Sequence, residues 1–390
     1  MKQGSLFGGI MLVAGCCIGA GMLGLPVLSA LAGFVPSIII FVICWLYMLS
    51  TGLLLLEANL WYGTEVSLIT LAEKTLGFAG KAVSWVVFLF LFYSLMVAYV
   101  AASGALVSDF VDQFTGLQLH HGIGGLLFTL LFGVLLYLGV GAVDWFNRIL
   151  MVGLIITYAL MVALGSSHVD NSLLRHSDWS FSTMVVPAVI ISFGFHNMIP
   201  SLTTYFKGHV KTLIMTIAIG SSIPLFIYLI WEWLILGIVP LSDFRVALDQ
   251  GQIATEALKD AVGYSWVLDI AQTFAFFAVI TSFLAVALSF VDFLADGLNV
   301  KKDAKGKVML ISLSLLPPLV CSLIYPNIFL SALNYAGGFG AVILFGILPA
   351  LMVWKGRYHL NMEGPRLLPG GKVILLIIIL IAAGVMSLQL

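Results

Sequence analysis

Two stretches of this 390-residue chain combine helix-breaking residues with apolar surroundings. The stretch "CCIGAGMLGLP" (16–26) contains three glycines and a proline, and "SFGFHNMIPSL" (192–202) contains a glycine, a proline and His196. An interrupted helix leaves backbone N–H groups that can bind an anion such as a carboxylate, and backbone carbonyls that can bind a cation. An imidazole titrates near pH ~6.5, so His196 adds a group suited to proton exchange. The two stretches therefore predict a binding site for a small polar ligand.

The composition indicates a membrane protein. Hydrophobic residues make up 61% of the chain and charged residues 9%, whereas ordinary soluble domains are about 25% charged. We therefore expect an all-α polytopic protein whose partner is the lipid bilayer, and the net charge of −1 gives no indication of nucleic acid. A membrane helix needs about 20 apolar residues. Eleven segments are read as spans: 7–31, 35–61, 82–113, 123–140, 148–165, 184–206, 212–239, 266–297, 308–324, 331–354 and 373–389.

The distribution of lysine and arginine predicts the orientation of these spans. Cytoplasmic loops are enriched in these two residues. With the N-terminus inside, 14 of the 17 Lys and Arg residues lie on the cytoplasmic side, and Arg175, Arg245 and Lys259 lie outside. We expect a cytoplasmic N-terminus, a periplasmic or extracellular C-terminus, an interfacial helix in 63–81 and a short surface helix in 240–265.

The two breaks occupy corresponding positions in two halves of the chain. Pro26 and Pro200 are 174 residues apart, and their spans run in opposite directions. Paired interruptions of this kind point to the binding site of a secondary transporter, because unwound backbone is tolerated at membrane depth where it lines a polar cavity. Alternatively, Gly15 and Gly19 form a packing face and the prolines only kink their helices. We expect a single domain over 1–390, with repeats at 7–165 and 184–354 and an extra helix at 373–389.

No pattern in the sequence indicates an enzyme. It contains no HExxH motif, no nucleophile elbow and no cluster of carboxylates at one depth. Each cysteine lies in an apolar segment, where it is expected to be a small buried hydrophobe rather than a disulfide partner or metal ligand. We expect no catalysis, no cofactor and no metal site. The cysteines are Cys16, Cys17, Cys44 and Cys321.

Five longer motifs are "GGIMLVAGCCIGAGMLGLPVLSALAGF", "LLLLEANLWY", "VDWFNRILMVGL", "SFGFHNMIPSL" and "TSFLAVALSFVDFLADGL". They resemble the bacterial hydroxy/aromatic amino acid permeases, especially the tyrosine-specific branch, in the amino acid/polyamine/organocation superfamily. The similarity covers essentially the whole chain. It implies a LeuT-type 5+5 inverted repeat with discontinuous helices 1 and 6 and one extra helix. It also implies proton-driven import of an aromatic amino acid across the inner membrane.

The resemblance implies which residues line the substrate site. The backbone beside the two breaks is expected to hold the carboxylate and the amine, and small residues at 19 and 21 allow close approach. The third span lines the site in this fold, although its apolar stripe would equally suit lipid or core packing. The expected substrate-binding residues are Gly19, Ala20, Gly21, Met22, Phe92, Met96, Tyr99, Phe193, Gly194, Phe195, His196 and Asn197.

Three residues are candidates for ion coupling. His196 lies in a break at the expected midplane, where it either exchanges a proton or only bonds to the freed backbone. Thr281 and Ser282 match the hydroxyl pair that holds the ion in sodium-coupled relatives. Here they form a sodium site, a vestige of one, or ordinary bonds to the carbonyl four residues earlier.

Two further acids lie within expected spans. Glu57 is expected to snorkel or to form an ion pair, with Arg148 as a candidate partner. Glu232 lies between Trp231 and Trp233, and this pattern is typical of the outer membrane interface.

The sequence thus predicts a transporter of the bacterial cytoplasmic membrane that imports an aromatic amino acid, foremost tyrosine, by proton symport with alternating access. The alternatives are a tryptophan or phenylalanine permease, a serine or threonine permease, and a sodium-coupled symporter. A serine or threonine permease has less need of an aromatic and methionine-rich third span. Candidate partners for a substrate hydroxyl are Ser103, Asn197, Asn334 and Tyr335.

Overall fold

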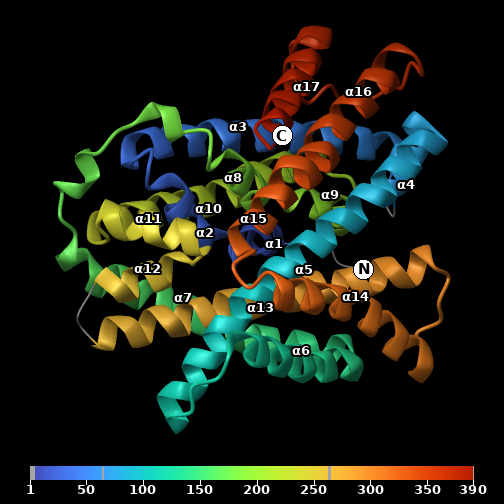
Figure 1. Ribbon diagram of the computed structural model, residues 1–390. Coiled ribbons are helices and arrows are strands. Elements are labelled where there is room, and N and C mark those ends of the chain that lie inside the picture. Colours follow the sequence, from blue (N-terminus) through green and yellow to red (C-terminus); the bar gives the residue numbers. More distant parts are fainter. Residues whose placement is uncertain (1–4, 64–65, 262–264, 390) are drawn as a thin grey trace.

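The computed structural model describes residues 5–63, 66–261 and 265–389, which form helices and connections without any strand (Figure 1). The α-helices are α1 (Leu6–Cys17), α2 (Gly21–Ser29), α3 (Phe34–Tyr62), α4 (Leu68–Leu76), α5 (Phe78–Thr115), α6 (His121–Leu138), α7 (Val140–Gly165), α8 (Val186–Ser192), α9 (Ile199–Tyr205), α10 (Val210–Ile238), α11 (Leu241–Gln250), α12 (Ala254–Ala261), α13 (Ser265–Gly297), α14 (Ala304–Ile324), α15 (Phe329–Tyr335), α16 (Leu348–Tyr358) and α17 (Gly371–Ser387). Short 3-10 turns are η1 (Ser166–His168), η2 (Leu173–Arg175), η3 (Trp179–Phe181) and η4 (Phe195–Met198), and η5 (Ala336–Ile347) is π-helical.

Within the described residues, nine helical stretches are long and apolar enough to cross a membrane. The pair α1 and α2, bent by 54° at its break, adds a tenth if it is counted as one span. Helix α17 corresponds to the predicted eleventh span but has only 17 residues, fewer than the about 20 that a crossing needs. A polytopic membrane protein is therefore supported, and the eleventh crossing stays a prediction.

The two predicted surface segments are helical. Helix α4 lies within 63–81, as expected. The segment 240–265 holds two helices, α11 and α12, where a single helix was expected. They separate at Gly251, whose φ is +65°. A Cβ atom there would lie 2.2 Å from the carbonyl oxygen of Asn327, so only glycine fits this turn.

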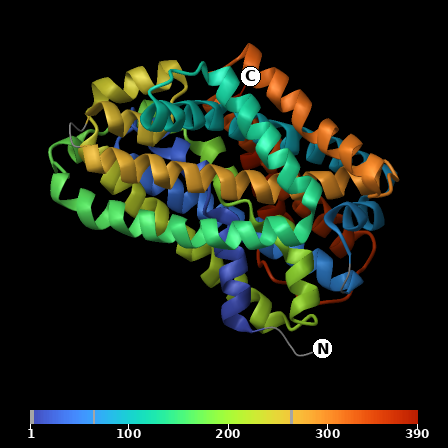
Figure 2. The ribbon, with the colours of Figure 1, turned by 90° about the horizontal axis from the view of Figure 1, so that it is seen from below.

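The helices pack in two groups around the bent helix. Helix α1 packs with α10, α2 packs with α8 and α10, and α3 packs with α8 and α10. Helices α5, α6, α13 and α14 pack with one another. The broken helices lie near the centre, between α3 on one side and α13 with α6 on the other (Figure 1). Helices α7 and α13 run side by side along one face (Figure 2). This arrangement encloses both helix breaks within the protein.

The connection between α7 and α8 covers the end of α2. The imidazole Nε2 of His176 donates to the carbonyl of Leu31 (2.8 Å), and the backbone N–H of Asp178 donates to the carbonyl of Ala32 (2.8 Å). The N–H and hydroxyl of Ser180 donate to the Asp178 carboxylate, and these bonds lower the pKa of Asp178. We call this side of the molecule the α11–α12 end and the opposite side the α4 end.

A buried ion pair joins α3 to α16. The guanidinium of Arg357 donates through Nε and Nη2 to the two carboxylate oxygens of Glu57, each at 2.6 Å. The N–H of Leu367 also donates to Glu57 (2.8 Å). The suggested partner was wrong, because Arg148 pairs instead with Asp144 four residues earlier on α7. Sequence proximity could not reveal a partner 300 residues away.

We expect Arg357→Ala to lower the free energy of unfolding by about 3–5 kcal/mol, because it leaves the Glu57 carboxylate buried and unpaired. The matched control is Arg148→Ala, which removes an exposed ion pair worth about 0–1 kcal/mol. Thermal unfolding of the purified protein in detergent, followed by tryptophan fluorescence, compares the two. Equal unfolding temperatures would contradict the importance of the Glu57–Arg357 pair.

Candidate functional site

The first break separates α1 from α2 at residues 18–20. Ile18 has an extended backbone (φ −77°, ψ 113°), so α1 ends at Cys17. The next helix, α2, begins at Gly21. At its start, the N–H of Met22 donates to the carbonyl of Gly19 (3.1 Å). The last carbonyls of α1 and the N–H of Ala20 must therefore find partners outside their own helix.

The second break separates α8 from α9. Helix α8 ends at Ser192, and the 3-10 turn η4 follows Gly194. Helix α9 restarts at Ile199 with Pro200 in its first turn, where the missing proline N–H does no harm. Both predicted breaks therefore exist. The last carbonyl of each first half-helix, at Cys17 and at Ser192, needs a partner outside its own helix.

The two breaks lie against each other in opposite directions. Helix α2 packs on α8, and α1 packs on η4. The thiol of Cys16 lies 3.9 Å from the carbonyl oxygen of Gly194. A Cβ atom on Gly21 would lie 2.8 Å from the hydroxyl oxygen of Ser192, so the small residue permits this close packing. Four segments thus meet around one buried junction.

Side chains of α10 satisfy carbonyls at both breaks. The Tyr228 hydroxyl lies 2.6 Å from the carbonyl oxygen of Cys17 and 2.9 Å from that of Ser192. Its one proton is donated to one of them at a time, so Tyr228 links the ends of α1 and α8. The indole Nε1 of Trp231 donates to the carbonyl of Met22 (3.0 Å). Helix α10 therefore holds both sides of the first break.

Side chains of α13 and α5 reach the first break from another side. The N–H of Ala20 donates to the hydroxyl oxygen of Ser282 (2.8 Å), and Tyr99 on α5 lies near the same side chain. A Cβ atom on Gly19 would lie 2.1 Å from the Ser282 hydroxyl oxygen. Thr281 instead donates to the carbonyl of Phe277 (2.8 Å), four residues earlier. Of the two hydroxyls, only that of Ser282 bonds to the break.

His196 is fully buried, and its ring faces α3 and η5. It stacks between the rings of Phe195 and Phe345, with centroids 4.8 Å away on both sides. Its Nε2 lies 2.9 Å from the hydroxyl of Thr51, which also lies 3.2 Å from the carbonyl of Met48. Both contacts form if Nε2 carries the proton and Thr51 donates to Met48. The Nδ1 atom is then an acceptor, and it has no hydrogen-bond partner among the described residues.

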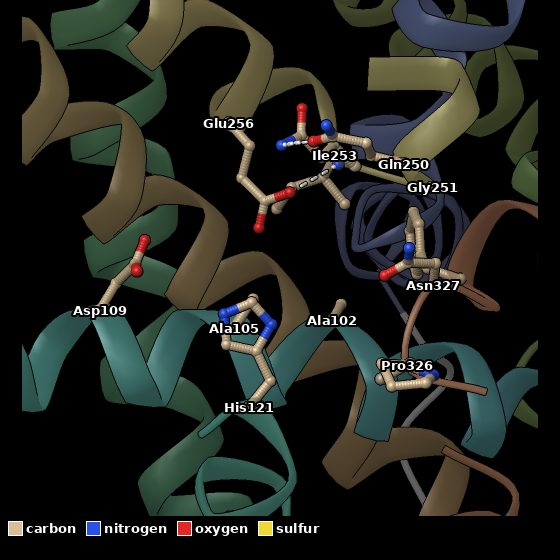
Figure 3. A pocket seen from close by; sticks show the side chains of 13 residues that line it. Ala102, Ala105, Asp109, His121, Gln250, Gly251, Ile253, Glu256, Pro326 and Asn327 are labelled. Carbon is tan, nitrogen blue, oxygen red and sulfur yellow. Dashed lines mark hydrogen bonds between the residues drawn. The ribbon is translucent and has the colours of Figure 1, made fainter. Parts of the chain in front are cut away.

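Two cavities lie at opposite ends of the site. At the α4 end, a cavity of about 410 Å³ is lined by Phe92, Asn197 and parts of α4, α9 and α13. At the α11–α12 end, a cavity of about 270 Å³ is lined by polar side chains that include Asp109, His121 and Glu256 (Figure 3). On α5, Phe92 lines the cavity at the α4 end, and Ala101 lines the cavity at the α11–α12 end. A rise of 1.5 Å per residue puts about 13 Å of helix between them.

The expected substrate residues divide into three sets. Gly19, Ala20 and Tyr99 meet Ser282 at the first break, whereas Gly21 and Met22 begin α2. Phe92 and Asn197 line the cavity at the α4 end, and Met96 lies buried on α5 between the cavities. The second break contains Phe193 and Gly194, while Phe195 and His196 face α3 and η5.

Sequence reasoning missed Ser192 and Tyr228, and it misread Trp231 as an interfacial anchor. Tyr228 and Trp231 are fully buried. A polar-tipped aromatic residue in the middle of an apolar segment needs a buried hydrogen-bond partner, and this was the signal available in the sequence at Tyr228.

Comparison with known proteins gives consistent matches. The family model described as "Tryptophan/tyrosine permease family" matches residues 2–389. The "Tyrosine-specific transport system 1" of Haemophilus influenzae is 31% identical, over 98% of this chain and 95% of that protein. The "Tryptophan-specific transport protein" of the same organism is 30% identical, over 91% and 88%. The "Low affinity tryptophan permease" of Escherichia coli is 31% identical, over 91% and 88%. These identities do not decide between tyrosine and tryptophan.

The contact between Gly19 and Ser282 predicts a compensating pair of substitutions. Gly19→Ala forces a methyl group against the Ser282 hydroxyl and should cost about 1–3 kcal/mol of stability. Ser282→Ala leaves the Ala20 N–H without its acceptor and should cost about 1–3 kcal/mol. In the double variant, the Cβ atom added at position 19 would lie 3.4 Å from the Cβ atom of residue 282, an ordinary contact distance. The double variant should therefore lose less stability than the sum of the two single losses. Thermal unfolding of all four proteins measures this coupling, and strict additivity would contradict it.

Proposed function

Because the chain belongs to the tryptophan/tyrosine permease family, we propose that it imports an aromatic amino acid across the bacterial cytoplasmic membrane by proton symport. The observation that carries the proposal is the pair of interrupted helices that pack against each other in opposite directions. Interrupted helices supply N–H groups for a carboxylate and carbonyls for an amine at membrane depth. The family consists of permeases, so the chain acts in transport.

The contacts between helices support a LeuT-type inverted repeat. When residues 7–165 are laid on 184–354, α1–α2 corresponds to α8–α9, α3 to α10, α5 to α13, α6 to α14 and α7 to α15–α16. The contacts of α1 and α2 with α10 then match those of α8 and α9 with α3. The contact of α7 with α13 matches that of α15 and η5 with α5, and that of α5 with α14 matches that of α13 with α6. Helix α17 is the additional helix.

The substrate is proposed to bind at the first break. Its carboxylate would lie near the beginning of α2, where the helix dipole favours negative charge. Its ring would pack on the apolar face of α5 that carries Phe92, Met96 and Tyr99. An aromatic ring buries ~150–250 Å², which at about 25 cal/mol per Å² gives roughly 4–6 kcal/mol. Ring burial would then dominate the affinity.

Tyrosine is the substrate we propose first. The side-chain oxygen Oδ1 of Asn334 is buried and has no hydrogen-bond partner among the described residues. Asn334 lies on α15, which packs against α2, α5 and α8. An unpaired amide oxygen beside these helices can accept a proton from a phenol, and such a bond discriminates against a ring without a hydroxyl.

Alternating access is supported by the two cavities. One lies at each end of the site, and Met96 and Tyr99 lie on the length of α5 between them. With the α4 end cytoplasmic, as lysine and arginine predict, a substrate would enter at the α11–α12 end and leave at the α4 end. Both termini would then have the predicted orientation.

Uptake of labelled tyrosine into proteoliposomes tests the proposal. In sodium-free buffer, an inward proton gradient should drive accumulation, since one charge moved through ~100 mV supplies about 2.3 kcal/mol, close to fifty-fold. Unlabelled tyrosine should compete best, tryptophan and phenylalanine less, and serine least. An absolute requirement for sodium, or strongest competition by serine, would replace this function with one of the alternatives.

The contacts of His196 predict a structural role for its ring. His196→Gln should keep proton-driven accumulation and its pH profile, because the imidazole is buried, stacked between two rings and held by the Thr51 hydroxyl. The unfolding temperature should fall, because two ring contacts are lost. The control is His359→Gln, at an exposed position. Exchange without accumulation in His196→Gln alone would assign proton coupling to His196.

A further inference from the structure

Glu232 is an acid within the predicted span 212–239, and it forms no ion pair with any residue that the structure describes. Its side chain is fully buried inside the protein, and its depth near the outer interface stays a prediction. Its Oε2 atom lies 2.7 Å from the hydroxyl oxygen of Ser29, the last residue of α2. Its Oε1 atom has no hydrogen-bond partner among the described residues. Of the two flanking tryptophans, Trp231 faces the interior, where its indole donates to the carbonyl of Met22.

The surroundings of Glu232 contain titratable groups but no ion pair. Titratable residues on the packed elements include Tyr228 on α10, Tyr158 on α7, Glu256 on α12, Asp243 on α11, and Arg175 with His176 in the connection after η1. Tyr228 and Tyr158 donate to backbone carbonyls, and His176 donates to the carbonyl of Leu31. Glu232 forms no ion pair with any residue that the structure describes.

The other buried glutamate shows what an ionised carboxylate receives in this protein. Glu57 accepts two bonds from Arg357 and one from the backbone of Leu367. Glu232 has a single hydroxyl neighbour. An unpaired charge in such a site is costly, and a buried acid without a partner normally takes up a proton instead.

The hydrogen bonds around Ser29 also depend on the protonation of Glu232. The Ser29 hydroxyl oxygen lies 3.2 Å from the carbonyl oxygen of Pro26 as well as 2.7 Å from Glu232. A hydroxyl has one proton to donate. If Glu232 is ionised, Ser29 must donate to it and the contact with Pro26 is lost. If Glu232 is protonated, it donates to Ser29, and Ser29 donates to Pro26, so both bonds form.

We propose that Glu232 is a proton-binding site whose protonation fixes the α2 half of the first broken helix to α10. The proposal rests on the proposed proton symport and names the residue that couples it. Proton uptake by Glu232 permits α2 to pack against α10 and close the α11–α12 end. Loss of the proton leaves an unpaired carboxylate at this contact and favours separation of the two helices. The proton therefore moves with each closure of the substrate site.

Transport by Glu232→Gln tests this coupling, because glutamine mimics the protonated acid but cannot release a proton. We expect tyrosine exchange to persist, while proton-driven accumulation falls from about fifty-fold to about one and the pH profile flattens. The control is Asp249→Asn, an exposed acid on α11, which should accumulate tyrosine like the wild type. Accumulation by Glu232→Gln with the wild-type pH profile would overturn the proposal.

Infrared difference spectroscopy of the unaltered protein provides a measurement that does not depend on any variant folding. Raising the pH should remove a carbonyl band of a protonated carboxylic acid, and Ser29→Ala should shift the frequency of that band. If no protonated carboxyl titrates in the wild type, Glu232 is not a proton site. If the band titrates but the wild type accumulates no aromatic amino acid, the transport proposal fails, and with it the coupling role. These outcomes separate failure of the Glu232 site from failure of the transport proposal.

Discussion

Backbone groups inside a lipid bilayer have no water to bond to, so each interrupted helix in this protein must find partners in other helices. The carbonyls of Cys17 and Ser192 share the Tyr228 hydroxyl, and the N–H of Ala20 bonds to Ser282. These bonds hold the breaks open as short irregular segments. The packing of α10 and α13 around the centre follows from this requirement, because those helices carry the side chains that complete the backbone bonds.

One face of α10 follows the first broken helix along its length. Gly220 lies against Val13, Tyr228 against Cys17, and further along the same helix Trp231 bonds to Met22 and Glu232 to Ser29. The residues at 228, 231 and 232 are neighbours on a helix surface because they are three and four positions apart. A movement of α2 relative to α10 must therefore break the Trp231 and Glu232 bonds together, which makes this seam a two-state element.

The breaks were predictable from the sequence because glycine and proline act on their own backbone. Gly19 lies in the first break and Gly194 in the second, and Pro200 lies in the first turn of α9, whereas Pro26 lies inside α2 without interrupting it. Their partners were not predictable. Tyr228 and Cys17 are 211 residues apart, and Ser282 and Ala20 are 262 apart. Glu57 and Arg357 likewise meet only after folding, and the tryptophans beside Glu232 suggested an interface because sequence alone gives no burial.

The two buried glutamates have different roles: Glu57 stabilises the packing of two helices, and Glu232 is proposed to control the movement of α2. Glu57 is fixed in an ion pair with Arg357, and its charge is matched in any state that keeps α3 and α16 together. Glu232 has only a hydroxyl neighbour, so its energy depends on whether it carries a proton and whether α2 lies against it. Glu57 therefore serves the packing of α3 on α16. A lone carboxyl at a movable contact can respond to a proton gradient, since the preferred packing of α2 changes with its protonation state.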